Sequence, residues 1–229
     1  MNIPVITIDG PSGSGKSELC KKISQKLQWN ILPSGLIYRI LALIILRNRN
    51  FIKNKNFYFL QSLNFFNIIN ENILKKNTFS ILIKNINTEE IGNFASKLAC
   101  IPYIRKYLLF KQRIFRQFPG LVADGRDMGT VVFPDACIKF FLKADLKIRA
   151  QRRLLSLKKN TNINFNQLLN IMKERDYRDN NRLISPLFPS AGSIIIDSTY
   201  MNIQQVFNLC INYIIKLNNI KTLNIHKNL

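Results

Sequence analysis

A short apolar run that leads into a glycine-rich octapeptide constrains the fold of this chain more than any other feature. Residues Pro4 to Asp9 are apolar and rich in β-branched side chains, which predicts a buried strand. The next eight residues fit the pattern G-x-x-x-x-G-K-[ST], and a helix with apolar residues at a spacing of four is expected from Lys16. A chance glycine-rich turn is the alternative, and the strand–loop–helix context argues against it.

An octapeptide of this kind binds phosphate groups. Its glycines allow a tight loop whose backbone N–H groups point inward, and the helix N-terminus adds partial positive charge. Lys16 is expected to reach the β- and γ-phosphates of ATP, and the Ser17 hydroxyl is expected to ligate Mg²⁺. The expected ATP-binding residues of the loop are Gly10, Pro11, Ser12, Gly13, Ser14, Gly15, Lys16 and Ser17.

Apolar runs alternate with helical patterns along the chain, which predicts an α/β fold with a parallel sheet covered on both faces. Further strands are expected at 31–32, 121–124, 137–142 and 193–197, and further helices at 34–48, 147–157, 164–182 and 202–217. We expect a single domain over residues 1–229. Its expected subdivisions are a low-complexity inserted lobe at about 49–92 and a lid at about 149–182 around the polar loop 156–164.

Several classes of protein are excluded. The longest apolar run, Ile40 to Leu46, is too short to span a membrane, and the N-terminus lacks a secretory pattern, so we expect a cytoplasmic protein. The four cysteines are far apart and His226 is the one histidine, so neither a disulfide, a Cys or His metal site, nor Ser-His-Asp chemistry is expected. A GTPase is disfavoured because no N-K-x-D sequence is present.

The net charge of +21, from 34 Lys and Arg against 13 Asp and Glu, has two interpretations. It suits RNA binding. It also follows from a bias toward Asn, Ile, Lys and Phe, which dominates residues 48–87, and no aromatic RNA-binding motif accompanies the lysines. We prefer the compositional interpretation and expect no nucleic-acid partner. A nucleic-acid-binding P-loop ATPase stays open as the alternative.

Two sets of arginines flank the expected lid loop. Arg175, Arg178 and Arg182 fall at spacings of three and four on the second lid helix, and Arg149, Arg152 and Arg153 lie together on the first. Transfer of a phosphoryl group needs cations around it, because charge spreads over its oxygens in the transition state. The alternatives are a solvated basic face or local pairing with Asp176 and Asp179.

Separated stretches, in the same order along the chain, resemble the bacterial cytidylate kinase family. They are residues 6–13, 34–39, 123–136, 173–176, 179–186 and 196–199, so that the resemblance covers nearly the whole chain. It implies a doubly wound parallel sheet of the P-loop NTPase kind with a small inserted monophosphate-binding lobe and a helical lid. It also implies ATP and Mg²⁺ as cosubstrates, and transfer of the γ-phosphate to CMP or dCMP. A kinase for another acceptor, such as UMP, is a lesser alternative.

The resemblance also implies roles for particular residues. Lys16, Arg126 and Arg182 are the expected catalytic residues, with Arg182 at the transferring phosphate, and Arg152 is expected to contact ATP. Asp127 is expected to accept from the cytosine amine while Arg105 donates to the acceptor side of the base. The residues implied around CMP are Ser34, Tyr38, Arg39, Ser96, Arg105, Arg126, Asp127, Arg175 and Asp179.

Two positions depart from the family pattern. Pro33 stands where the family usually has Asp, and Glu18 stands where a small hydroxyl residue is usual. Neither change touches Lys16 or the arginines, so activity is expected. The expected partners are the small molecules ATP and CMP or dCMP, bound by a monomer.

Overall fold

The structure, a computed structural model, describes residues 3–47, 86, 88–157 and 163–220. It divides into two compact units, residues 1–33 with 112–229 and residues 34–111. Most of the lobe expected at about 49–92 lies outside the described residues, as do residues 158–162 of the expected lid loop. Within the described ranges, no helix combines the length and apolarity needed to cross a membrane.

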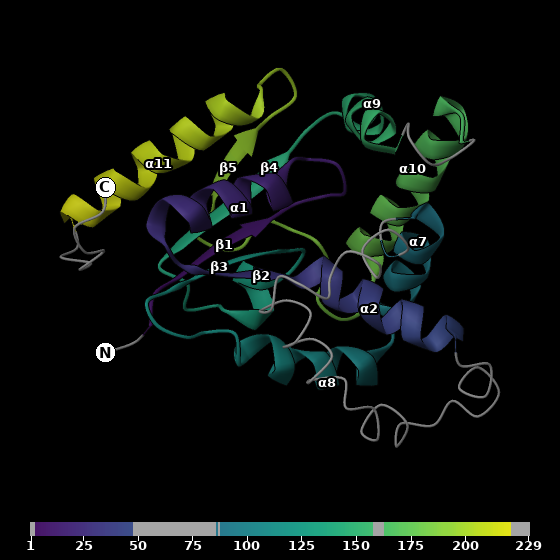
Figure 1. The fold of residues 1–229 in the computed structure, drawn as a ribbon, viewed down its shortest axis with the longest axis horizontal. Helices are drawn as coiled ribbons and strands as arrows, with labels where there is room; N and C mark the ends of the chain where they lie inside the picture. The colour runs from purple at the N-terminus through teal and green to yellow at the C-terminus, as the bar shows by residue number, and fades with distance from the viewer. Residues whose placement is uncertain (1–2, 48–85, 87, 158–162, 221–229) are drawn as a thin grey trace. The chain divides into compact units, whose positions relative to one another are not determined.

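The larger unit is built on a five-stranded parallel sheet with the strand order β2-β3-β1-β4-β5 (Figure 1). Its central strand is the one that precedes the glycine-rich loop, and Asp9 at its end pairs with Gly125 on one side and Phe141 on the other. The predicted parallel α/β sheet is therefore confirmed. The strands are β1 (Val5–Asp9), β2 (Asn30–Pro33), β3 (Leu121–Gly125), β4 (Ile138–Lys143) and β5 (Ile194–Asp197).

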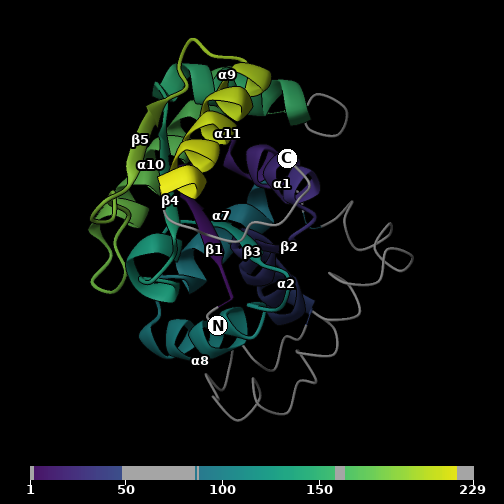
Figure 2. The ribbon, with the colours of Figure 1, turned by 90° about the vertical axis from the view of Figure 1, so that its left-hand side faces the viewer.

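Two helices, α1 (Lys16–Leu27) and α11 (Ile203–Ile220), lie side by side against one face of this sheet (Figures 1 and 2). Leu19 and Ile23 of α1 and Ile214 of α11 are fully buried together with Ile6 and Ile8 of β1. Burying one such side chain stabilises the folded state by about 1.5–3 kcal/mol. This cluster is the main core of the unit, and it fixes the start of α1 beside the end of β1.

The helices α9 (Leu146–Leu157) and α10 (Phe165–Asn181) pack as a pair around a separate apolar cluster that includes Leu168 and Met172. Asn164 starts α10 with a reciprocal cap, since its side chain accepts from Gln167 N–H at 2.9 Å and the Gln167 side chain accepts from Asn164 N–H at 3.2 Å.

The predicted end of α10 is wrong by one residue. Arg182 is extended, with φ −67° and ψ 142°, and the chain then folds back until Leu187 N–H donates to Asp179 O at 2.8 Å. The spacing had predicted that Arg182 shares a helical face with Arg175 and Arg178. This prediction is wrong, because Arg182 lies beyond the end of the helix.

A short π-helical turn, η1 (Met128–Val132), follows β3 and was not predicted from the sequence. Its bonds span five residues: Val132 N–H donates to Asp127 O at 3.1 Å, and Phe133 N–H donates to Met128 O at 2.7 Å. The turn packs against β1 and β3. It therefore holds residues 126–129 at the carboxyl ends of the two central strands, the edge where ligands bind in parallel sheets.

The smaller unit contains α2 (Ser34–Arg47), α7 (Glu89–Leu98) and most of α8 (Pro102–Arg113). α2 packs on α7, and Ile37, Leu41 and Ile91 are buried in the unit. Thr88 caps α7 by accepting from Ile91 N–H at 3.3 Å. Only α2 among these helices was predicted from the sequence.

Candidate active site

The glycine-rich loop has the conformation that its sequence requires. Gly10 has φ 149°, and a Cβ atom there would lie 2.2 Å from Leu142 O, so no other residue fits. Gly13 and Gly15 also have positive φ, at 77° and 91°. The Lys16 amine curls back over the loop and donates to Pro11 O at 2.7 Å. The loop thus presents its lysine and its backbone around one small volume at the end of β1.

The surroundings of Lys16 disfavour the positive charge on its amine. Its side chain is 6% exposed. Burial lowers the pKa of the Lys16 amine well below its ordinary value, and the positive charge of Arg126 lowers this pKa further. An anion bound in the loop would reverse both effects, because it replaces the lost hydration and balances the two cations.

Asp124, at the end of β3, lies opposite the loop. Its Oδ2 accepts from the Ser17 hydroxyl at 2.7 Å, and its Oδ1 is buried with no hydrogen-bond partner among the described residues. Burial raises the pKa of Asp124, while the charge of Lys16 and the Ser17 hydrogen bond oppose the rise. A hydroxyl and a carboxylate with an orphaned oxygen fit Mg²⁺, which prefers oxygen ligands and takes few of them from the protein.

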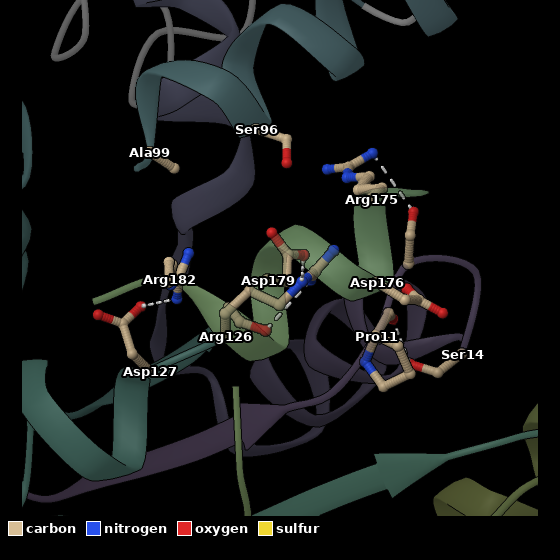
Figure 3. A network of polar contacts seen from close by, with 12 residues as sticks. Pro11, Ser14, Ser96, Ala99, Arg126, Asp127, Arg175, Asp176, Asp179 and Arg182 are labelled. Carbon is tan, nitrogen blue, oxygen red and sulfur yellow. Dashed lines mark hydrogen bonds and ion pairs between the residues drawn. The ribbon is translucent and has the colours of Figure 1, made fainter. Parts of the chain in front are cut away.

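Four of the residues predicted from the sequence meet in two ion pairs at this edge of the sheet (Figure 3). Arg126 Nε donates to Asp179 Oδ2 at 2.7 Å, and Arg182 lies 3.8 Å from Asp127 Oδ1. All four side chains are at most 15% exposed. Burial opposes ionisation of Asp179, yet the charges of Arg126 and then Arg175 hold its pKa below the usual value. The ion pairs therefore keep these buried side chains charged, because each charge is balanced by a partner of opposite sign.

The lid arginines reach the glycine-rich loop. Arg149 donates to Ser12 O at 3.0 Å and to Asp176 Oδ2 at 2.7 Å, and Arg175 donates to Ser12 Oγ at 3.5 Å. Asp176 and Asp179 thus pair with arginines from other elements, and the charge of Arg175 on α10 also acts on Asp179. Within that helix, Arg178 also lies 3.9 Å from Glu174, as an ion pair.

Arg152 has different surroundings. Its guanidinium donates to Ser198 O at 2.6 Å and to Thr199 O and Met201 O at 3.1 Å each, in the loop between β5 and α11. Ser198 Oγ in turn donates to Ser14 O at 3.2 Å. Arg152 therefore organises the backbone beside the glycine-rich loop.

The remaining predicted residues lie in the smaller unit. Arg39 donates to Ile86 O at 2.7 Å and to Thr88 O at 3.0 Å, and Gly92 leaves room for its guanidinium. Arg105 donates to Ala99 O at 3.1 Å and its guanidinium carbon lies 5.8 Å from the centre of the Tyr38 ring. Ser34 and Ser96 are buried. Within this unit, Arg39 and Arg105 thus donate to backbone carbonyls, and Arg105 also lies near the Tyr38 ring.

The sequence places Asp124 in a predicted binding loop after a strand, with Arg126 and Asp127, but gives it no role of its own, and it assigns none to Asp9. Both are acids at the ends of apolar runs, and such a position at the carboxyl edge of a parallel sheet was the available signal. Of the two departures noted above, Glu18 is exposed on the first turn of α1, and Pro33 ends the edge strand β2 in register with Asp124.

A parallel sheet whose central strand runs into this loop, with a Ser–Asp pair and arginines around it, defines a P-loop kinase. The family model described as cytidylate kinase matches residues 6–216, and the chain belongs to this family. Among curated relatives, the cytidylate kinase of Buchnera aphidicola subsp. Baizongia pistaciae is 54% identical, with 96% of this chain and 97% of that protein covered. That of Pectobacterium carotovorum is 48% identical, with 92% and 95% covered, and that of Erwinia tasmaniensis is 45% identical, with 92% and 94% covered. These matches do not favour the two alternatives that the sequence left open, a nucleic-acid-binding P-loop ATPase and a kinase for another acceptor such as UMP.

Proposed function

We propose that this chain transfers the γ-phosphate of ATP to the phosphate of CMP or dCMP, giving ADP and CDP or dCDP, in pyrimidine nucleotide metabolism. One observation carries the proposal. In a chain of the cytidylate kinase family, Lys16, the Ser17–Asp124 pair and Arg126 converge at the carboxyl ends of β1 and β3. The other residues of the larger unit surround this centre with charges suited to phosphate groups.

The transfer needs no proton acceptor. A phosphate oxygen of the acceptor, which already carries negative charge, attacks the γ-phosphorus. The bond from this phosphorus to the β–γ bridging oxygen breaks, and its electron pair leaves with ADP. Catalysis then consists of positioning and charge neutralisation, for which we assign Lys16, Arg126 and Arg182. The lowered pKa of the Lys16 amine fits this role, because binding of the polyphosphate restores its full charge.

We assign the magnesium ligands to Ser17 and Asp124. When bound at these residues, the ion would neutralise charge on the phosphates of ATP. Asp124 Oδ1 is buried without a partner among the described residues, which is costly in a protein unless a ligand is provided. No group of three or more His, Cys, Asp or Glu that could hold a metal occurs among the described residues, which suits an ion held mainly by phosphates.

Recognition of the cytosine base is assigned to Asp127 and Arg105. Cytosine presents an amino donor at C4 and acceptors at N3 and O2, whereas uracil presents a carbonyl at C4 and an N–H at N3. With uracil, both polar side chains would lose their partners, at about 1–3 kcal/mol for each unpaired group. The remaining assignments, which rest on the family resemblance, are Ser34, Tyr38, Arg39, Ser96, Arg126, Arg175 and Asp179 around the monophosphate and Arg152 near ATP.

The test is ADP release measured with ATP, Mg²⁺ and one acceptor at a time: CMP, dCMP, UMP, AMP or single-stranded RNA. The expected result is turnover that depends on CMP or dCMP, with UMP poorer by more than about tenfold. Turnover that depends on RNA instead would overturn the proposal in favour of a nucleic-acid-binding ATPase. Equal turnover with UMP would move the assignment to a broader pyrimidine kinase.

A pair of variants tests the magnesium assignment in the same assay. Asp124→Asn removes the negative charge beside Ser17, so the Mg²⁺ concentration needed for half-maximal turnover should rise by at least about tenfold. The matched control is Asp135→Asn, which removes an exposed carboxylate paired with Arg116 at 2.6 Å. An unchanged Mg²⁺ requirement in Asp124→Asn would show that this carboxylate does not hold the ion.

A further inference from the structure

One buried carboxylate at the site has no part in the mechanism described above. Asp9 ends β1, directly before Gly10 of the glycine-rich loop, and is 3% exposed. Its Oδ1 accepts from Met128 N–H at 2.9 Å, and its Oδ2 accepts from Gly129 N–H at 2.8 Å. Each carboxylate oxygen therefore serves one backbone donor of the turn η1.

These two donors belong to the first residues of η1, where the turn itself supplies no acceptor. Further along, the donors are satisfied within the turn, since Val131 N–H donates to Asp127 O at 2.9 Å. The approach of the backbone to Asp9 is close. A Cβ atom at Gly129 would lie 3.4 Å from Asp9 Oδ2 and 2.9 Å from Thr7 Oγ1, so a side chain at residue 129 would force the turn away.

The turn begins directly after the residues assigned to phosphate and base. Arg126 is two residues before Met128, and Asp127 is the residue next to it. Arg126 is held at its tip by Asp179, but the backbone that carries it is held by Asp9. The same carboxylate is one residue from Gly10, so its position ties the start of the glycine-rich loop to the start of η1.

We propose that Asp9 is a positioning residue, whose ionised carboxylate clamps the backbone of Met128 and Gly129 and thereby sets Arg126 and Asp127 relative to Lys16. This inference rests on the proposed function for its effect on catalysis. The clamp itself is a property of the resting protein and can be observed without turnover.

The ionisation of Asp9 responds to its surroundings. Burial raises the pKa of Asp9 to about 7, although the N–H donors of Gly129 and Met128 oppose the rise. Asp127, the residue before η1, raises this pKa, and Lys16 of α1 lowers it. On the neighbouring strands, the partners of Asp9 in the sheet are the uncharged Gly125 of β3, which follows Asp124, and Phe141 of β4. A proton on the carboxyl would weaken the clamp, because one of its oxygens then becomes a donor.

The first experiment follows the backbone amide protons of Met128 and Gly129 by NMR as the pH of the resting protein is varied. Both signals are expected to shift together, with one midpoint near neutral pH in wild type, and the transition should be absent in Asp9→Asn. The matched control is Asp145→Asn, since the Asp145 carboxylate also accepts from two backbone donors, Lys147 at 2.8 Å and Ile148 at 3.2 Å, but at an exposed helix start. This control should keep the transition. Amide signals of Met128 and Gly129 that keep the same position at every pH in wild type and in Asp9→Asn would overturn the clamp, because loss of the carboxylate charge would then leave both donors unaffected.

The second experiment compares pH profiles of ADP release with CMP. Asp9→Asn is expected to lower kcat by at least about tenfold, since misplacement of a catalytic group by about 1 Å costs on the order of a hundredfold, with KM for CMP changed far less. The phosphates of both substrates titrate in the same range and contribute equally to the acid limb of kcat/KM in both enzymes. Wild type should show an additional acid loss of kcat/KM from Asp9, and only this part should disappear in the variant.

The results of the two experiments distinguish a failure of the proposed function from a failure of the Asp9 clamp. Wild type without CMP-dependent turnover would refute the proposed function, while the amide titration would still decide the clamp. A folded Asp9→Asn variant with wild-type kcat and the same acid limb would overturn the positioning role. Asp145→Asn should leave kcat and the profile unchanged.

Discussion

Asp9 makes the stability of the protein depend on pH in an unusual direction. Its pKa is raised from 3.8 to about 7 in the folded protein, whereas the unfolded chain keeps a value near the ordinary one. Between these two values the folded state binds more protons than the unfolded state. The free energy of unfolding contributed by this group therefore rises as the pH falls, which is the opposite of a carboxylate in a salt bridge.

The magnitude follows from the shift. From about pH 8 to about pH 6, a group with a folded pKa near 7 contributes about 1.4 kcal/mol to the free energy of unfolding, while its unfolded form stays ionised. Urea unfolding at each pH, in wild type and in Asp9→Asn, isolates this contribution as the difference between the two proteins. Trp29, the one tryptophan of the chain, is buried in the main core of the larger unit, so its fluorescence follows the relevant transition.

We expect wild type to gain about 1.4 kcal/mol relative to Asp9→Asn over this range. Asp197→Asn is the control. Hydrogen bonds from Thr199 hold the pKa of the exposed Asp197 below its usual value, so both states of that group are ionised at these pH values. Parallel pH curves for wild type and Asp9→Asn would refute the argument, because they would show that Asp9 titrates alike in both states.

Three further predictions concern the residues assigned to catalysis and specificity. Lys16→Ala should fold and keep less than about a tenth of wild-type turnover, whereas Lys21→Ala, an exposed lysine on the same helix, should be near normal. Arg182→Ala should lower kcat by on the order of a thousandfold with a much smaller change in KM for CMP, and a change mainly in KM would mean ground-state binding. Asp127→Ala should lose most of the preference for CMP over UMP through poorer reaction with CMP. A preference as strong as in wild type would leave Asp127 as a structural partner of Arg182.

The sheet could be predicted because its strands have a recognisable local sequence pattern. Val5–Asp9 and Leu121–Gly125 are short apolar runs that end at Asp-Gly, and the helix after the glycine-rich loop begins at Lys16, as the motif requires. Thr88, followed by Glu89 and Glu90, is a start signal for α7 that could have been used. The turn η1 gives no such signal, since its geometry depends on the carboxylate of Asp9 from a distant part of the chain.

Residues could be assigned to the candidate site from motifs and from the family resemblance, but the contacts among them could not be predicted. The spacing of Arg175 and Arg178 on α10 gave their helix face, yet nothing local indicated that Asp179 would pair with Arg126, which lies in another element. Asp124 could be placed in a binding loop after its strand, but its role was not predicted, because nothing local indicates that the fold brings it beside Ser17. Long-range pairing of charges is a product of tertiary structure, which periodicity does not encode.

The α9–α10 pair has a thermodynamic consequence that goes beyond the site. Its apolar cluster is separate from the main core. We therefore expect the two helices to unfold locally as one cooperative unit, at a lower free energy than global unfolding. Arg149 connects the helix pair to the glycine-rich loop, because it donates both to Ser12 of the loop and to Asp176 of α10. A ligand that orders the loop therefore also suppresses opening of the helix pair, and by reciprocity a closed helix pair strengthens the binding of that ligand.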